Sequence, residues 1–116
     1  MIEKTFPSPE AALADVPDGA TVIMNNQYNP FDDCTAPPYN ISAIKIGLLN
    51  DFNTELARIA EAHDNVVLTD QHTPYLGHGH HFEDTSCPHY QPGLVGFMKD
   101  LIHPNNSGHA HLAAQW

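Results

Sequence analysis

The sequence has few basic residues and no long apolar segment. Lysine and arginine together number 4 against 14 acidic residues, so the formal net charge is -10 at pH 7. Nucleic acids and anionic membranes are bound mainly by clustered basic side chains, and this balance argues against both partners. No apolar run reaches the roughly 18 residues that a membrane-spanning helix needs. We therefore expect a globular protein that neither binds nucleic acid nor spans a membrane.

Cysteine is also scarce. The chain has 2 cysteines, Cys34 and Cys87, and each lies near prolines in a stretch that we expect to be a loop. A disulfide bond between them would suit an exported protein, although residues 1–4 lead into no apolar segment of the signal-peptide kind. Two unpaired thiols are equally compatible with the sequence.

The length and composition are those of a single small domain. Of the 116 residues, 41% are hydrophobic and 16% charged, which allows one modest core. Ser8 followed by proline and an acid predicts a helix over residues 9–15. Residues 21–24 and 66–69 are short apolar runs bounded by turn residues, and they predict two buried strands. Because both runs are apolar throughout, we expect helices to cover both faces of the sheet.

The longest periodic segment, residues 41–63, predicts an α-helix. Its apolar residues recur at spacings of three and four and form a single stripe. The stripe consists of Ile41, Ile44, Leu48, Phe52, Leu56 and Ile59. A strand, a long helix and a second strand predict a right-handed βαβ unit with parallel strands. The expected fold class is therefore α/β with a parallel sheet.

Residues 70–99 contain many prolines, glycines and histidines, which predicts a long loop after the second strand. Ligands of α/β proteins bind at the carboxyl ends of strands, so we expect this loop to line a substrate cleft. His78, His80 and His81 offer imidazoles for Zn²⁺ or Ni²⁺ but lack the spacing of helical zinc-ligand pairs. We expect no cofactor, and metal binding by these histidines is the alternative. Residues 94–98 are predicted to form a short helical turn.

The stretch that begins at Asp100 carries the clearest chemical pattern in the chain. An acid and a histidine, Asp100 and His103, stand just ahead of Pro104. Proline fits the first turn of a helix and the residues after it are good N-caps, which predicts a helix over residues 108–116. His103 is then a loop residue whose imidazole is held by Asp100 through one nitrogen. A general-base histidine needs this arrangement.

The run D-L-I-H-P-N-N-S-G-H-A resembles the last conserved block of the SGNH (GDSL-type) hydrolases. The polar segment that ends in Tyr28, Asn29 and Pro30 is similar to the one after the fourth strand of that family. The resemblance implies that Asp100 is the orienting acid and His103 the general base of a Ser-His-Asp triad. It also implies a flavodoxin-like three-layer sandwich, in which the two predicted strands would be the fourth and the fifth.

The nucleophile block of that family is missing here. The sequence contains no G-D-S, G-x-S-x-G or G-x-N-D pattern, and no serine stands in a strand–turn–helix context. The serines are Ser8, Ser42, Ser86 and Ser107. Ser86, in the long loop, is the alternative nucleophile within the chain. The resemblance therefore covers the C-terminal half of an SGNH fold, as one domain over residues 1–116.

Two functions follow from this partial resemblance. The first is hydrolysis of small acyl or acetyl esters, in which this chain supplies the Asp-x-x-His half of the site. The strand at residues 21–24 would then need a partner at its free edge, namely a nucleophile-bearing N-terminal half, another chain or a swapped copy. The second is a catalytically incomplete module that binds a metal or a partner through the loop at residues 70–99.

Overall fold

The computed structural model describes residues 5, 7, 16–39 and 41–116. The elements in this part are β1 (Val22–Asn25), α2 (Ala43–Ala62), β2 (Val66–Thr69), the 3-10 turn η1 (Thr73–Tyr75) and α3 (Asn106–Ala113). The helix expected over residues 9–15, with its cap at Ser8, lies outside the described residues. Neither of the described helices is long and apolar enough to cross a membrane.

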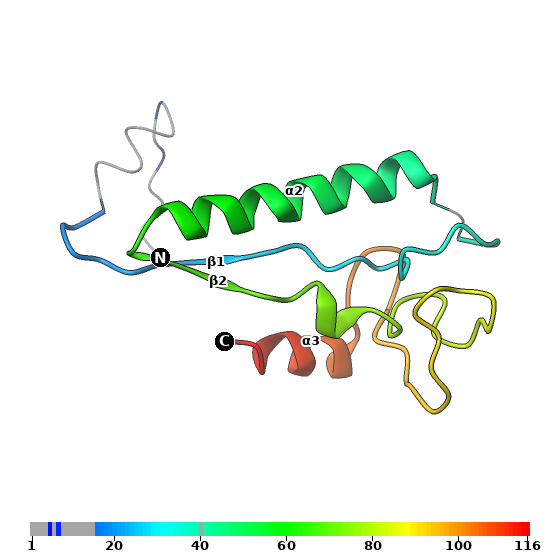
Figure 1. The fold of residues 1–116 in the computed structure, drawn as a ribbon. Coiled ribbons are helices and arrows are strands. Elements are labelled where there is room, and N and C mark those ends of the chain that lie inside the picture. Colours follow the sequence, from blue (N-terminus) through cyan, green and yellow to red (C-terminus); the bar gives the residue numbers. More distant parts are fainter. Residues whose placement is uncertain (1–4, 6, 8–15, 40) are drawn as a thin grey trace.

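The two strands form a parallel pair joined by α2, as predicted. The register runs from Val22 opposite Val66 to Asn25 opposite Thr69. α2 lies along one side of this pair and contacts β2 (Figure 1). The described part is therefore a small α/β unit with two parallel strands and two helices.

Local side-chain hydrogen bonds position α2. The Ser42 hydroxyl accepts a hydrogen bond from the backbone N–H of Lys45 at 3.3 Å, which satisfies one of the free donors of the first turn. The buried residue of this helix is Asn53. Its side-chain amide donates to the carbonyl of Gln27 at 2.8 Å and accepts the N–H of Gln27 at 2.7 Å. This pair of bonds fixes the middle of α2 to the chain that follows β1.

The apolar surfaces of α2 and of the sheet are largely exposed in the part that the structure describes. Ile44, Leu48 and Phe52 of the apolar stripe are 77%, 64% and 53% exposed. Ile23 and Val67 face each other across the sheet and are 54% and 51% exposed. The prediction that helices cover both faces is therefore wrong for the described residues. The reason is that α2 covers one face, and no described element makes extensive contact with the other.

The best-packed region lies in the loops beyond the carboxyl ends of the strands, next to α3 (Figure 1). Its buried apolar side chains are Cys34, Tyr75, Cys87 and Phe97. Tyr75 is fully buried, and its ring centre lies 4.6 Å from that of Tyr28 and 5.5 Å from that of Phe97. The core therefore belongs to the irregular half of the molecule.

Residues 94–98 do not form the predicted helical turn. The N–H of Phe97 donates to the carbonyl of His78 at 2.7 Å, and the carbonyl of Phe97 accepts the N–H of Asn105 at 2.6 Å. Met98 and Pro104 pair in an isolated antiparallel bridge. These bonds use the backbone groups that a helical turn would need, so the segment is extended.

α3 begins at Asn106 rather than at the predicted residue 108, because Asn105 is its N-cap. The Asn105 side chain accepts the N–H of Gly108 at 2.9 Å. Pro104 therefore precedes the cap and does not lie in the first helical turn. His103 is, as predicted, a loop residue just ahead of the helix.

Candidate active site

The loop between Met98 and Pro104 brings Asp100 and His103 together. Nδ1 of His103 lies 2.9 Å from one carboxylate oxygen of Asp100 and 3.0 Å from the other. The first of these oxygens also accepts the backbone N–H groups of His103 at 2.9 Å and of Ile102 at 3.1 Å. The predicted contact between the acid and the imidazole is confirmed, and the loop backbone itself fixes the carboxylate.

The same backbone donors set the charge of the acid. The N–H of His103, followed by that of Ile102, lowers the pKa of Asp100 to about 2, and the His103 ring adds to this effect. Asp100 is therefore ionised near neutral pH. An ionised carboxylate at Nδ1 favours the tautomer with its proton on Nδ1, which leaves Nε2 as the basic nitrogen. The His103 side chain is 66% exposed, so a reacting group can reach the ring.

Side chains from two other loops hold the Asp100–His103 loop. The hydroxyl of Tyr28 donates to the carbonyl of Ile102 at 2.7 Å, and Nε2 of His80 lies 3.2 Å from the carbonyl of Leu101. Burial, and then the charge of Asp100, raises the pKa of Tyr28, so this hydroxyl keeps its proton. The acid–base pair is thus attached to the loop after β1 and to the histidine-rich loop after β2.

A buried carboxylate organises the histidine-rich loop, and it was not among the predicted site residues. Asp32 is 1% exposed. One of its oxygens accepts the N–H groups of Gly77 at 2.9 Å and Gly79 at 2.8 Å, and the other accepts the N–H of His81 at 3.1 Å. Burial raises the pKa of Asp32 despite these three donors. The sequence signal for this contact is only an acidic pair in one loop and a Gly-x-Gly in another.

Two glycines allow the backbone to approach this carboxylate. Gly77 has a backbone φ of +86°, a conformation that residues with a side chain rarely adopt. A Cβ added to Gly79 would lie 2.8 Å from both carboxylate oxygens of Asp32. The Gly-His-Gly sequence therefore serves a close backbone contact.

The three histidines considered for metal binding lie in different surroundings. His78 stacks on Phe97 with ring centres 4.0 Å apart, and His80 stacks on Tyr39 at 4.2 Å. His81 is 3% exposed. In the described part of the chain, the groups within ligand distance of His81 are Cys34, Asp84 and Cys87. The three histidines therefore do not converge on one metal site.

The described serines do not meet His103. The hydroxyl of Ser86 donates to the carboxylate two residues before it at 2.6 Å, and Ser42 caps α2. Ser107 lies in the first turn of α3, and Ser8 lies outside the described residues. The described residues therefore bring Asp100 and His103 together, and no described serine forms a hydrogen bond with either.

A disulfide bond joins Cys34 and Cys87, which decides between the two states that the sequence left open. Their Cα atoms are 5.4 Å apart, and 53 positions separate them along the chain. The bond ties the loop after β1 to the histidine-rich loop, a short distance along the chain from Asp32.

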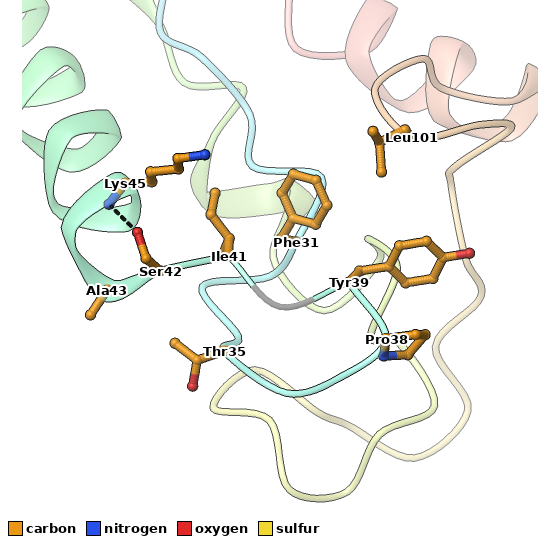
Figure 2. Close-up of a pocket in the computed structure, with 9 residues that line it drawn as sticks. All are labelled: Phe31, Thr35, Pro38, Tyr39, Ile41, Ser42, Ala43, Lys45 and Leu101. Carbon is orange, nitrogen blue, oxygen red and sulfur yellow. Dashed lines mark hydrogen bonds between the residues drawn. The ribbon is translucent and has the colours of Figure 1, made fainter.

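A cavity of about 650 Å³ adjoins the Asp100–His103 loop (Figure 2). Leu101 lines it from that loop, and Phe31, Tyr39 and Ile41 add apolar surface. Lys45, in the first turn of α2, is the charged side chain among the described lining residues. Such a wall suits a small substrate with an apolar part.

No family model, no curated protein and no solved structure matches this chain. The resemblance to SGNH hydrolases therefore rests on the residues around Asp100 and His103 and on the segment that ends in Tyr28, Asn29 and Pro30.

Proposed function

We propose that this chain supplies the acid–base half of an SGNH-type serine ester hydrolase. The observation that carries the proposal is the Asp100 carboxylate within 2.9 Å of Nδ1 of His103, in a loop directly ahead of a helix. The proposed fold is the C-terminal part of a flavodoxin-like sandwich, in which β1 and β2 are the fourth and fifth strands. The proposed substrate is a small acyl or acetyl ester.

The proposed chemistry is acyl transfer through a serine ester. Nε2 of His103 takes the proton of the serine hydroxyl as its oxygen attacks the ester carbonyl, and then returns that proton to the leaving alcohol. Asp100 keeps the proton of the neutral ring on Nδ1 and stabilises the imidazolium. Water then attacks the serine ester with the same help from His103 and releases the carboxylic acid of the substrate. The cavity beside Leu101 would hold the acyl part of the substrate.

The nucleophile is proposed to arrive on a segment that pairs with the free edge of β1. No described residue pairs with this edge. Ile23 and Val67 are exposed, and they form an apolar face of the sheet that a further segment could cover. A second copy of this chain would bring the same serines, so it could extend the sheet without completing the triad. A segment with a Gly-Asp-Ser turn would do both.

Complementation tests this proposal directly. Turnover of a short-chain activated ester is measured for the chain alone and after mixing with the N-terminal half of an SGNH hydrolase. We expect the chain alone to be slower by several powers of ten, because loss of a triad nucleophile costs up to roughly a millionfold in kcat.

Two histidine variants complete the test. His103→Ala should abolish the complemented activity, whereas His109→Ala changes an exposed histidine of α3 and should preserve it. Rapid turnover by the chain alone that His103→Ala abolishes would reveal a nucleophile within the chain. Complemented turnover that survives His103→Ala would rule out the general-base role.

A further inference from the structure

We propose that Cys34, His81, Asp84 and Cys87 form a Zn²⁺ site when the disulfide bond is reduced. One potential ligand atom from each of these residues lies within 4.8 Å of all the others. Cys34, His81 and Cys87 are 3%, 3% and 6% exposed, and the Asp84 side chain is 32% exposed, so three ligands are buried and the site meets solvent at Asp84. The proposal is independent of ester hydrolysis, because it involves neither Asp100 nor His103.

The His81 ring is the observation that points to a ligand. Its side chain is 2% exposed, and its Nε2 is buried with no hydrogen-bond partner among the described residues. Its Nδ1 lies 3.8 Å from a carboxylate oxygen of Asp84, which is too long for a hydrogen bond. Buried polar atoms are nearly always paired, and an unpaired one calls for an explanation such as an ion. A metal ion in the cluster would give this imidazole a partner.

Backbone turns place three of the four ligands, His81, Asp84 and Cys87, on the same side of one loop. The N–H of Asp84 donates to the carbonyl of His81 at 3.0 Å, and the N–H of Cys87 donates to the carbonyl of Asp84 at 3.1 Å. Two successive turns therefore bring every third side chain together. The backbone of His81 is also held by Asp32 at 3.1 Å. None of these bonds depends on the disulfide, so the arrangement can persist after reduction.

The ligand set favours zinc. Two thiolates, an imidazole and a carboxylate match a tetrahedral site with bonds of about 2.3 Å to sulfur and about 2.0–2.2 Å to nitrogen and oxygen. Thiolate ligands select against Mg²⁺ and Ca²⁺, which prefer oxygen. The same pair of cysteines is typically a disulfide in an oxidising compartment and a pair of metal ligands in a reducing one.

The redox step uses a dithiol reductant. It transfers two electrons and two protons, breaks the bond between the two sulfurs, and leaves two thiols while its own thiols become a disulfide. Binding of Zn²⁺ then releases the two thiol protons to solvent. In the oxidised protein the sulfurs are not available as thiolates, so the disulfide and the zinc site exclude each other.

Cobalt is the probe, because a bond between thiolate and Co²⁺ gives an ultraviolet charge-transfer band that histidine ligands alone do not. The full chain is reduced with a dithiol, freed of reductant under nitrogen, and titrated with Co²⁺ and then Zn²⁺. We expect one equivalent of Co²⁺ to produce the band and Zn²⁺ to displace it. The oxidised protein should give no band.

Two matched acid variants locate the site. Asp84→Asn should weaken Co²⁺ binding by at least about tenfold, the scale of loss seen for groups around a metal. Glu83→Gln changes the exposed neighbouring acid and should leave the affinity unchanged. Absence of the band in the reduced protein overturns the proposal, as do equal affinities of the two variants. A reduced chain that unfolds and does not regain its circular dichroism on addition of Zn²⁺ also overturns it.

Discussion

At the scale of single residues, Asp32 takes the place of regular secondary structure. It accepts three backbone N–H groups from residues 77–81, so this loop has a defined shape without helix or sheet bonds. Each donor would otherwise be buried without a partner, which is unfavourable. The loop in turn carries His80, whose ring reaches the Asp100–His103 loop. A carboxylate that is remote from the proposed chemistry therefore helps to position it.

Replacement of Asp32 by Ala should lower the free energy of unfolding by on the order of 3–5 kcal/mol, because three buried donors lose their acceptor. Asp51→Ala removes an exposed carboxylate from α2 and should change it by less than about 0.5 kcal/mol. Urea denaturation followed by circular dichroism measures both. Equal stabilities of the two variants would contradict the role given to Asp32.

Two glycine-to-alanine changes should have opposite signs. Gly79→Ala places a Cβ 2.8 Å from the Asp32 oxygens and should cost roughly 1–3 kcal/mol, as overpacking does. Gly47 lies inside α2 with nothing within 4 Å of an added Cβ, so Gly47→Ala should stabilise by up to about 1 kcal/mol. Thermal unfolding of both variants is the measurement. Shifts of Tm in the same direction would show that the close approach at Gly79 is not important.

The Asp100 carboxylate should stay ionised, and so keep its contact with His103, in mildly acidic solution. The pKa of Asp100 falls from 3.8 to about 2 in the folded protein, so its ionised form stabilises the loop above pH 4 and loses this effect as the pH falls through about 2. Carbon NMR of the Asp100 carboxyl should give this low midpoint. His103→Ala keeps the backbone N–H that is the main cause, so its midpoint should stay low. A return to the ordinary value would mean that the ring, not the backbone, fixes the carboxylate.

The residues that sequence could predict are those whose contacts are local. Asp100 and His103 lie three positions apart, and their hydrogen bond follows from one turn of the chain. Asp32 is different, because its partners lie 45 to 49 positions away. The metal-ligand cluster was missed for a related reason. Its members His81, Asp84 and Cys87 repeat every third position, but only the packing of the two loops brings Cys34 to them.

At the scale of elements, α2 has strong local signals and little burial. The apolar stripe was enough to predict the helix, and the apolar runs, with the long helix between them, were enough to predict both strands and their parallel pairing. The faces that these elements bury were not predictable, because burial depends on what packs against them. In the described part, Ile44, Leu48 and Phe52 remain exposed. An apolar helix face and a free strand edge are typical of surfaces that another segment covers.

The isolated chain should therefore self-associate at high concentration. Sedimentation velocity should give a mass above the 12.8 kDa of one chain. Leu48→Glu adds a charge to the exposed stripe and should shift the protein toward monomer. Asn50→Glu adds the same charge to the same helix outside the stripe and should not. A compact monomer at all concentrations would contradict the expectation that these surfaces need a partner.

At the scale of the whole molecule, the chain is elongated, with extents of 49 × 30 × 26 Å. One end holds the strands, and α2 runs from this end to the loops, where its first turn lines the cavity beside Leu101 (Figure 1). The other end holds the long loops, where Tyr75 and Phe97 are buried and the disulfide crosses between loops. The proposed acid–base pair lies with the long loops, and Leu101 and Ile102 of its own loop are each 55% exposed.

Helices usually open locally less readily than loops. Because the loop at residues 77–81 is buried and α2 is largely exposed, we expect the reverse order in this protein. Amides opened by local fluctuations exchange with heavy water fastest where few apolar contacts hold the structure. The N–H groups of Gly77, Gly79 and His81, which donate to buried Asp32, should therefore exchange more slowly than those in the middle of α2. Exchange followed by NMR or mass spectrometry would test this, and faster exchange in the loop would refute it. The loop at residues 77–81 would then be the rigid part of the molecule. α2 would be the more mobile part, and binding of a partner would immobilise it.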